Sequence, residues 1–345
     1  MIKVLVNGMG VIGKRVALAI HKQDDMELVG VSDAMITGPI RTLLSPYGEL
    51  HGTKLYCSAP QFYDSMKKDG NVSGLLEDLL KSGDVDVVVD ASPKGIDVKN
   101  KELYKKYNVK AIFQGGASAD IADVSFNSFT NYDEAKGKQF VRVVSCNTTG
   151  LARTIGSLNK KYGVENAFVT IVRRATDPPK VKIGPINAIV PDMKIPSHHG
   201  PDLKTVLHDV DVFTMAVKVP ETLTHVHIVE AALKKEISKE ELLNTFRETP
   251  RINLIKATHG FGSNAELMEM MRDLGRPRYD MPEVAVWEEL TSVRGNKVYW
   301  MHAIHSESIV VPESVDAIRA IFDLMPSEES IEKTNKAMGI MKFDI

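Results

Sequence analysis

Short apolar runs separated by longer segments of helical periodicity dominate the first 145 residues. The runs are rich in Val, Ile and Leu, and they occupy residues 2–6, 28–31, 85–89, 109–113 and 140–144. A polar residue follows each run directly, and the intervening segments are long enough for crossover helices. Buried parallel strands have this pattern. It predicts an α/β fold in which a doubly wound parallel sheet forms the first part of the molecule.

The pattern changes after residue 146. Alternating or apolar strand patterns occur at residues 168–172, 212–219 and 225–229. Helices are predicted from Leu151 to about Gly163, from Pro312 onward and over residues 331–341. The second part is therefore expected to be an α+β unit with a mixed or antiparallel sheet.

Composition and charge narrow the possible functions. The chain has 345 residues, of which 43% are apolar and 26% charged, as in a soluble protein of about two domains. A net charge of −2 gives no basis for general nucleic-acid or membrane-surface binding. Two cysteines are too few for a disulfide framework and favour a reducing compartment. Since neither a signal peptide nor an apolar run of about 18 residues is present, we expect a soluble cytoplasmic protein.

A glycine motif lies between the first strand and the first helix. Gly8, Gly10 and Gly13 form G-x-G-x-x-G, in which the first glycine permits a tight turn, the second a close approach of pyrophosphate and the third helix packing. The helix N-terminus offers unpaired amides to the phosphates. We therefore expect a Rossmann dinucleotide site, the alternative being a glycine-rich turn without a ligand.

Asp33 ends the second strand, about 20 residues after Gly13, where a carboxylate can bind the ribose 2′-hydroxyl of NAD. It would repel the 2′-phosphate of NADP. The alternatives are a solvent-facing turn residue, or a 2′-phosphate held by Lys14, Arg15 or Arg41.

Cys146 lies between a buried strand and a helix, in the segment Ser145-Cys146-Asn147-Thr148-Thr149-Gly150. A thiol at a helix N-terminus is expected to have a lowered pKa and to be a nucleophile at neutral pH. Thr148 adds a hydroxyl beside the same amides. The alternative is an inert buried thiol, the interpretation adopted for Cys57.

His225 and His227 share one face of a strand, so either could supply a general acid or base to the thiol. A zinc site with His198 and His199 is the alternative, but no acidic or cysteine ligand has metal-site spacing among them, and we expect no metal.

Residues 178–201 are rich in Pro, Ser, His and Gly, and long loops of this kind are usually functional or disordered. The loop ends in Ser197-His198-His199-Gly200, and Arg173 and Arg174 close the preceding strand. Such side chains and amides hold phosphates. Together with Thr148 they indicate an anionic substrate.

Taken together, these motifs resemble the archaeal-type phosphorylating glyceraldehyde-3-phosphate dehydrogenase family over nearly the whole chain. The matching segments, in the family's order, are NGMGVIGKR, FQGG, VVSCNTTG, IVRR, GPINAIVP, PSHHGPD, HVH, HSES and TNKAMGI. The resemblance implies a nucleotide-binding domain of residues 1–140 and 310–345 and a catalytic domain of residues 141–309. It also implies a homotetramer acting in glycolysis or gluconeogenesis.

The resemblance further assigns roles to individual residues. Cys146 would attack the aldehyde, hydride would pass to NAD or NADP, and inorganic phosphate would cleave the thioester to 1,3-bisphosphoglycerate. His225 would be the base that takes the proton leaving as the carbonyl forms. Substrate and phosphate contacts are implied for Ser145, Asn147, Thr148, His199 and Gly200. Nucleotide contacts are implied for Val11, Ile12, Gly116 and Arg174.

Two departures from the family pattern change the expectations. Asp33-Ala34-Met35 replaces a Lys-Thr-Arg stretch suited to a 2′-phosphate, which favours NAD over NADP. Ser306 replaces a glutamine near the nicotinamide and is retained as a candidate contact. Two rivals remain: another thioester-forming semialdehyde or acyl-phosphate reductase, and a nucleotide-sensing binding protein that uses Cys146 as a redox switch.

Overall fold

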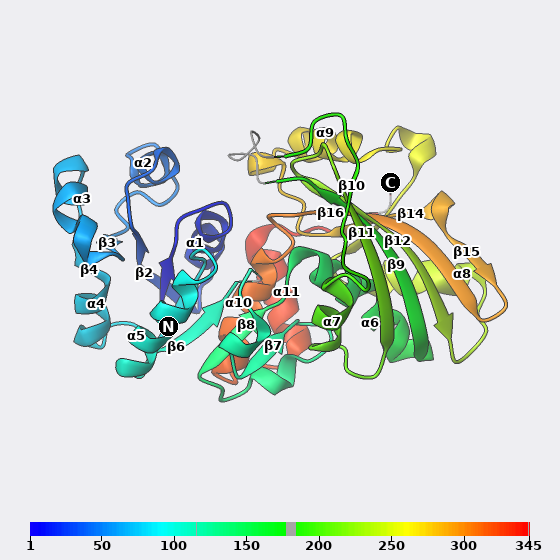
Figure 1. Cartoon of the computed structure of the whole chain (residues 1–345), viewed down its shortest axis with the longest axis horizontal. Coiled ribbons are helices and arrows are strands. Elements are labelled where there is room, and N and C mark those ends of the chain that lie inside the picture. Colours follow the sequence, from blue (N-terminus) through cyan, green and yellow to red (C-terminus); the bar gives the residue numbers. More distant parts are fainter. Residues whose placement is uncertain (115, 177–183, 344) are drawn as a thin grey trace. The chain divides into compact units, whose positions relative to one another are not determined.

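The computed structural model describes residues 1–114, 116–176, 184–343 and 345, which form two compact units (Figure 1). Unit 1 consists of Met1–Ser128, Tyr132–Val143 and Val311–Gly339, and unit 2 of Phe129–Asn131, Val144–Val310 and Ile340–Ile345. The sequence placed residues 340–345 with the nucleotide-binding domain, whereas the structure places them in unit 2. Within the irregular segment 178–201, residues 178–183 lie outside the described residues.

Unit 1 is built on a sheet of eight parallel strands in the order β4-β3-β2-β1-β5-β6-β8-β7. The strands are β1 (Ile2–Asn7), β2 (Met26–Asp33), β3 (Leu55–Cys57), β4 (Gly74–Leu75), β5 (Val87–Asp90), β6 (Lys110–Phe113), β7 (Val124–Phe126) and β8 (Phe140–Val143). The side chains of Val4, Leu5 and Val6 are all fully buried, because a central parallel strand is covered on both faces. The predicted doubly wound sheet is confirmed.

Helices from both ends of the chain belong to unit 1. They are α1 (Gly13–His21), α2 (Gly38–Leu44), α3 (Tyr63–Asp69), α4 (Leu76–Ser82), α5 (Ile96–Lys106), α10 (Val311–Ile321) and α11 (Ser327–Met338). The C-terminal helix α10, red in Figure 1, packs against α1, β6 and β8. Helix α11 ends before the predicted residue 341 because Gly339 adopts the left-handed conformation, with φ of +65°.

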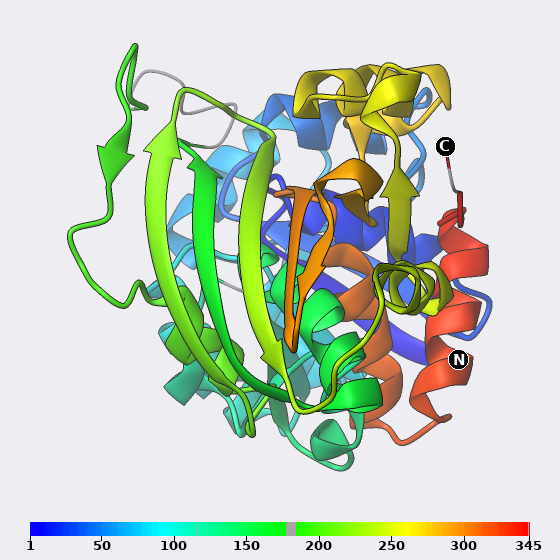
Figure 2. The same ribbon diagram turned by 90° about the vertical axis from the view of Figure 1, so that its right-hand side faces the viewer.

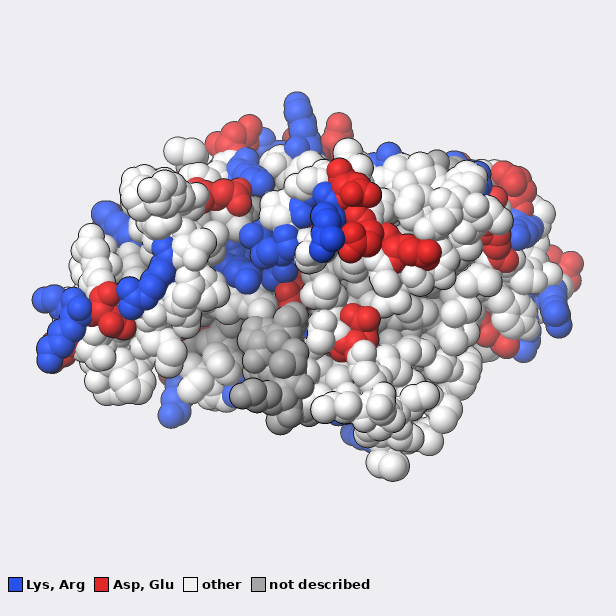
Figure 3. Space-filling view, turned by 90° about the horizontal axis from the view of Figure 1, so that it is seen from above, with Lys and Arg blue, Asp and Glu red and all other residues white. Residues whose placement is uncertain are grey.

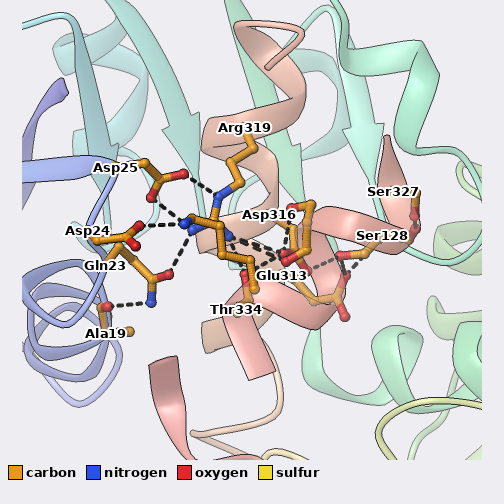
Figure 4. A network of polar contacts seen from close by, with 12 residues as sticks. Ala19, Gln23, Asp24, Asp25, Ser128, Glu313, Asp316, Arg319, Ser327 and Thr334 are labelled. Carbon is orange, nitrogen blue, oxygen red and sulfur yellow. Dashed lines mark hydrogen bonds and ion pairs between the residues drawn. The ribbon is translucent and has the colours of Figure 1, made fainter. Parts of the chain in front are cut away.

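Buried polar contacts fix α10 within unit 1 (Figure 4). The fully buried guanidinium of Arg319 donates to both carboxylate oxygens of Asp25, at 2.8 and 2.9 Å, and to the Gln23 side chain at 2.7 Å. The Glu313 carboxylate accepts hydrogen bonds from the backbone amide and the hydroxyl of Ser128. Helix α10, from the C-terminal part of the chain, is therefore part of the same packed unit as the N-terminal strands.

The strand order of unit 1 reverses at β1, which pairs with β2 on one side and β5 on the other. Gly8 follows β1 with φ of +88°, and a Cβ there would lie 2.8 Å from the backbone of Ala91, just after β5. A Cβ on Gly13, at the start of α1, would lie 1.8 Å from the Gly8 carbonyl oxygen. In open α/β sheets, ligands bind at the carboxyl ends of strands where the order reverses.

Unit 2 contains a mixed sheet in the order β10-β11-β9-β12-β16-β14-β13, and β15 pairs with β16 outside this path (Figure 2). The strands are β9 (Val164–Arg174), β10 (Val190–Pro191), β11 (Asp211–Val219), β12 (Thr224–Leu233), β13 (Ile252–Ile255), β14 (Val284–Trp287), β15 (Ser292–Arg294) and β16 (Lys297–His305). Strand β9 is parallel to β11 and antiparallel to β12. The expected α+β unit with a mixed sheet is confirmed.

The helices of unit 2 are α6 (Cys146–Tyr162), α7 (His199–Lys204), α8 (Lys239–Glu248) and α9 (Asn264–Asp273). Helix α6 packs against β9, β12 and β16 through the fully buried Leu151, Ile155 and Leu158. The chain end is hydrogen-bonded beside β13, since the amide of Ile345 donates to the Leu254 carbonyl and the Lys256 amide donates to the Ile345 carbonyl. This pairing explains why residues 340–345 belong to unit 2.

Charged side chains of both signs are interspersed among the described residues on the face drawn in Figure 3, in keeping with the net charge of −2. No helix in the described part of the chain is both long enough and apolar enough to cross a bilayer.

Candidate active site

Cys146 is the first residue of α6, the longest helix described in the structure. The preceding Ser145 caps the helix, and its hydroxyl oxygen accepts a hydrogen bond from the Thr148 amide at 3.3 Å. The first amides of a helix have no intrahelical acceptor. The predicted position of Cys146, at a helix N-terminus, is therefore confirmed.

His225 of β12 faces the thiol. The Sγ atom of Cys146 lies 3.4 Å from Nε2 of His225, and the imidazole is 3% exposed. The strand and the helix thus bring together two residues that are 79 positions apart in the sequence.

The other ring nitrogen of His225 is occupied by a backbone donor. The Arg174 amide donates to Nδ1 of His225 at 2.9 Å. Since a backbone N–H is only a donor, Nδ1 must be unprotonated, and a neutral ring then carries its hydrogen on Nε2. His225 is therefore a hydrogen-bond donor toward Cys146 in this conformation, which differs from the base that the resemblance implied.

The electrostatic environment keeps both groups neutral. Burial, with the guanidiniums of Arg174 and Arg173, holds the pKa of His225 well below its ordinary value. Burial also raises the pKa of the Cys146 thiol, although Arg174, the Asn147 amide and Arg173 act to lower it. The sequence predicted a lowered thiol pKa from the helix N-terminus alone. In the structure, desolvation outweighs that contribution.

The hydroxyls expected to contact phosphate are bonded within the protein. The Thr148 hydroxyl lies 2.6 Å from the Asp202 carboxylate, to which it donates, and the Ser145 hydroxyl lies 2.8 Å from Thr148 Oγ1. With its hydrogen committed to Asp202, Thr148 accepts from Ser145. Asp202 was missed in the sequence, although it ends the PSHHGPD segment.

His199 and Gly200 are likewise engaged internally. The ring nitrogens of His199 lie 3.2 Å from Asn147 Nδ2 and 3.0 Å from Ser197 Oγ, and burial lowers the pKa of this histidine to about 3. The Gly200 amide donates to the Thr214 hydroxyl at 3.0 Å. Both groups, expected as substrate or phosphate contacts, are therefore bonded within the protein in this conformation.

The Asn147 side chain is also held at both ends. Its Oδ1 lies 2.9 Å from Nε2 of His227, and its Nδ2 faces His199. The backbone amide of Asn147 acts on the Cys146 sulfur and acts to lower the pKa of the thiol, which burial raises. The second histidine of the HVH pair thus supports the loop that carries the thiol.

Arg173 was noted in the sequence with Arg174 but was not chosen as a site residue. Its buried Nε has no hydrogen-bond partner among the described residues. After burial, its charge is among the causes that lower the pKa values of His198, His199 and His225. A guanidinium whose buried Nε–H lacks a partner in this structure is suited to an anionic ligand.

Ser306, the candidate nicotinamide contact, is 3% exposed. Its hydroxyl donates to the Leu223 carbonyl at 2.7 Å, and its amide donates to the same oxygen at 2.8 Å. The hydroxyl hydrogen is therefore committed to the protein backbone in this conformation.

The glycine motif in unit 1 fits a dinucleotide. Nothing lies within 4 Å of a Cβ built on Gly10, whereas Gly8 and Gly13 are closely packed. Val11 and Ile12 form the turn before α1, where the helix amides begin, and Gly116 lies exposed in the turn after β6. A ligand backbone can therefore approach Gly10 without displacing protein atoms.

Asp33 holds the same loop. One carboxylate oxygen accepts from the Met9 amide at 2.8 Å, and the other accepts from the amide of Ala34 at 2.7 Å. Two nearby cations proposed for a 2′-phosphate are already bonded: Arg15 to the Val11 carbonyl, and Arg41 to the backbone and side chain of Asp69. The Asp33 carboxylate therefore places a negative charge at the end of β2.

Among the residues that the structure describes, no three His, Cys, Asp or Glu side chains are grouped as metal ligands. The four histidines of the zinc alternative do not converge on one point, since His199 and His227 hydrogen-bond to Asn147 from opposite ends of its amide.

Comparison with known proteins gives one family. The model of the glyceraldehyde 3-phosphate dehydrogenase C-terminal domain matches residues 145–273. A glyceraldehyde-3-phosphate dehydrogenase of Hyperthermus butylicus is 50% identical over 343 residues, 99% of this chain and 98% of that protein. Enzymes of the same name from Thermococcus kodakarensis and Metallosphaera sedula are 48% and 49% identical, each covering 99% of both chains.

Proposed function

Because the chain belongs to the glyceraldehyde-3-phosphate dehydrogenase family, we propose that it oxidises D-glyceraldehyde 3-phosphate to 1,3-bisphosphoglycerate with a nicotinamide cofactor and inorganic phosphate. The observation that supports this best is the pairing of the Cys146 thiol, at the start of α6, with Nε2 of His225 at 3.4 Å. A thiol in this position can form the thioester that the reaction requires.

The first step is attack of the Cys146 thiolate on the aldehyde carbon. Because Nε2 of His225 already carries a hydrogen, the thiol proton passes to water, and the Nε2–H stabilises the sulfur left behind. A carbon–sulfur bond forms, and the carbonyl oxygen becomes an alkoxide. The Nε2–H of His225 and the amide of Asn147 are the donors placed to stabilise that charge.

The bound nicotinamide supplies the hydride acceptor for the next step. When the alkoxide carbon loses its hydride, the carbonyl of a Cys146 thioester forms. Inorganic phosphate then attacks that carbonyl, the same two donors stabilise the oxygen, and the thiolate of Cys146 leaves. The products are the acyl phosphate and the regenerated thiolate.

Arg173 is the residue we propose for holding substrate phosphate. Its buried Nε is unsatisfied, and its charge acts on Cys146, His198 and His225. The hydroxyls of Ser145 and Thr148 and the polar groups of His199 and Gly200 would have to exchange their present bonds to take this role.

We propose NAD as the preferred cofactor. Gly8, Gly10, Val11, Ile12 and Gly13 would hold the pyrophosphate through the α1 amides. Asp33 would accept a hydrogen bond from the adenosine ribose, and its negative charge opposes a 2′-phosphate.

A homotetramer is the assembly we propose. Unit 2 exposes apolar side chains on one sheet face, where Phe168 and Phe213 stack at 5.9 Å and each is 43% exposed. Adjacent apolar side chains exposed in this way are typical of surfaces that bind another chain. Sedimentation equilibrium of the purified protein measures the assembly, and a monomer would contradict it.

The test of the activity is reduced-nicotinamide absorbance with glyceraldehyde 3-phosphate, for the wild type and Cys146→Ser. We expect turnover that requires phosphate and is lost in the variant. An amino-acid semialdehyde serves as the second substrate. Turnover of the semialdehyde alone would support the rival reductase, and turnover retained by Cys146→Ser would contradict the thioester.

A further inference from the structure

A continuous line of buried polar side chains runs through unit 2 behind the thiol. It starts at Trp300 of β16, whose indole Nε1–H donates to Nδ1 of His302 at 3.0 Å. Both side chains are at most 1% exposed. An indole nitrogen is only a donor, so Nδ1 of His302 is unprotonated and the hydrogen of this ring is on Nε2.

The second link joins two histidines of adjacent strands. Nε2 of His302 lies 2.9 Å from Nδ1 of His227, and the rings meet edge to face with centroids 4.7 Å apart. Since Nε2 of His302 carries the hydrogen, it donates, and the hydrogen of His227 is on Nε2. Burial lowers the pKa of both rings, that of His302 to about 3, so each carries one hydrogen.

The third link reaches the residue after the nucleophile. Nε2 of His227 donates to Oδ1 of Asn147, which leaves the Asn147 amide nitrogen to donate to Nε2 of His199. The hydrogen of His199 is then on Nδ1 and points to Ser197 Oγ at 3.0 Å. The indole donor at one end of this line therefore favours the present orientation of the Asn147 side-chain amide.

The line ends at a group that is only an acceptor. The Ser197 hydroxyl lies 2.8 Å from Thr214 Oγ1, which in turn donates to the Ser197 carbonyl at 3.0 Å. Every hydrogen between the indole and this carbonyl has one consistent direction. Reversing that direction would place an imidazole N–H against the indole N–H, so Trp300 excludes the reversed state.

The histidine pair also touches the helix that carries the thiol. A Cβ built on Gly150, four residues after Cys146, would lie 3.5 Å from His227 Cε1 and 3.6 Å from His302 Nε2. The rings therefore pack directly against the first turns of α6. A change in their hydrogen positions is transmitted to Asn147 over two hydrogen bonds.

We propose that Trp300 is a positioning residue for the reaction, because its indole N–H orders the hydrogens of His302 and His227 and thereby fixes the side chain of Asn147 beside Cys146. The expected effect on kcat rests on the proposed function, whereas the expected effect on the tautomers of His302 and His227 does not. The indole has no direct contact with the reacting atoms. It acts by disfavouring the reversed direction of these hydrogen bonds, in which an imidazole N–H would face the indole N–H.

The variant that tests this is Trp300→Phe, which keeps an aromatic ring against Phe246 and removes the donor. Without the indole, the reversed direction no longer places two N–H groups against each other, so we expect His302 and His227 to populate both tautomers. The fraction of molecules with the native Asn147 orientation would fall, and kcat would fall between about twofold and tenfold. KM for the cofactor should not change, since unit 1 carries the glycine motif.

The matched control is Trp287→Phe. Trp287 is also a buried tryptophan of unit 2, but its indole donates to the Phe261 carbonyl, outside the line. It should lose similar stability without a change in kcat or in tautomers. A second pair, His302→Gln and His302→Leu, separates polarity from packing, because glutamine keeps an acceptor toward Trp300 and a donor toward His227.

The readout independent of activity is the 15N spectrum of histidine-labelled protein in the solid state, which distinguishes protonated from unprotonated ring nitrogens. We expect a single tautomer for His302 and His227 in the wild type and in Trp287→Phe, and a mixture in Trp300→Phe. Unchanged spectra in Trp300→Phe would overturn the ordering role, whether or not the enzyme is active. A mixture with unchanged kcat would overturn the kinetic role alone. If Trp287→Phe lost as much kcat as Trp300→Phe, the loss would be an effect of packing. The same conclusion would follow if His302→Gln and His302→Leu lost equal amounts of kcat.

Discussion

The Arg174 amide donates to Nδ1 of His225, and this bond places the ring hydrogen on the nitrogen that faces Cys146. A backbone amide of the neighbouring strand β9 therefore makes Nε2 of His225 a hydrogen-bond donor, not an acceptor, toward the Cys146 sulfur. Burial and the guanidiniums of Arg174 and Arg173 hold the ring pKa well below its ordinary value, and a protonated ring would also donate from Nε2.

A side chain that keeps a donor should therefore replace His225 better than an apolar one. We expect His225→Leu to lower kcat about a hundredfold, as the loss of one donor to a developing oxyanion does. We expect His225→Gln to retain measurably more activity. Pre-steady-state measurement of the first turnover in each variant checks this, and equal losses in both variants would instead support the base role.

The reactivity of Cys146 should increase with pH beyond the range of a free thiol. Burial raises its pKa above the ordinary value of about 8.5, so the thiolate fraction is small at neutral pH and grows as the pH approaches the raised pKa. The iodoacetamide alkylation rate of the protein without substrates, measured from neutral to alkaline pH, gives this pKa. A plateau below pH 8 would contradict the prediction.

Removal of a guanidinium should raise that thiol pKa further. Arg173 acts to lower the Cys146 pKa, so Arg173→Gln should shift the alkylation profile toward higher pH. The same variant should raise KM for glyceraldehyde 3-phosphate about tenfold or more if Arg173 holds its phosphate. Lys204→Gln, a change at the far end of α7, serves as a control for general charge effects. A normal KM in Arg173→Gln would remove this residue from the phosphate site.

Cofactor choice should depend on the charge of Asp33. Asp33→Asn keeps an oxygen that can accept from the Met9 amide and removes the negative charge. We expect kcat/KM with NAD to fall about tenfold and the ratio of NADP to NAD efficiency to rise. Steady-state kinetics with each cofactor provide the measurement. An unchanged ratio would show that Asp33 only holds the loop.

Stability should depend strongly on the buried guanidinium of α10. Arg319→Met leaves Asp25 without its bidentate partner, and we expect a loss of about 3 kcal/mol in the free energy of unfolding. The Asp25 pKa is lowered in the folded chain despite its partial burial, so its contribution is present above a pH of about 4 and is lost as the pH falls through the folded value.

Urea unfolding at neutral and acidic pH tests that contribution, with the exposed Arg272→Met as control. The difference between wild type and Arg319→Met should narrow as the pH falls. A constant difference would assign the loss to packing alone.

Local patterns in the sequence predicted much of the fold. The Val-rich runs that became β1 and β5 are buried on both faces, and Gly8, Gly10 and Gly13 have the conformations or surroundings that their spacing implied. These features depend on residues close together in the chain. Strands β3, β4 and β7 were missed because two or three residues give no periodicity.

The hydrogen-bond partners and tautomers of the site residues could not be predicted from local sequence patterns. Thr148 is bonded to Asp202, and Ser306 is bonded to a carbonyl 83 residues earlier. The tautomers of His225 and His227 depend on Arg174 and Trp300, which only the folded sheet brings near. Sequence patterns show which groups can donate or accept, but partners distant in the chain decide which of them are already used.

The return of α10 and α11 to unit 1 has a consequence for synthesis on the ribosome. Arg319 and Asp25 are 294 residues apart, so the first unit cannot close its core until nearly the whole chain has been translated. Unit 2 likewise gains the backbone hydrogen bonds of Ile345 to Leu254 and Lys256 only when the last residue has been added. The nascent chain therefore has to remain unaggregated with an exposed parallel sheet for most of its elongation, and a ribosome that stalls before codon 311 releases a product with neither unit complete.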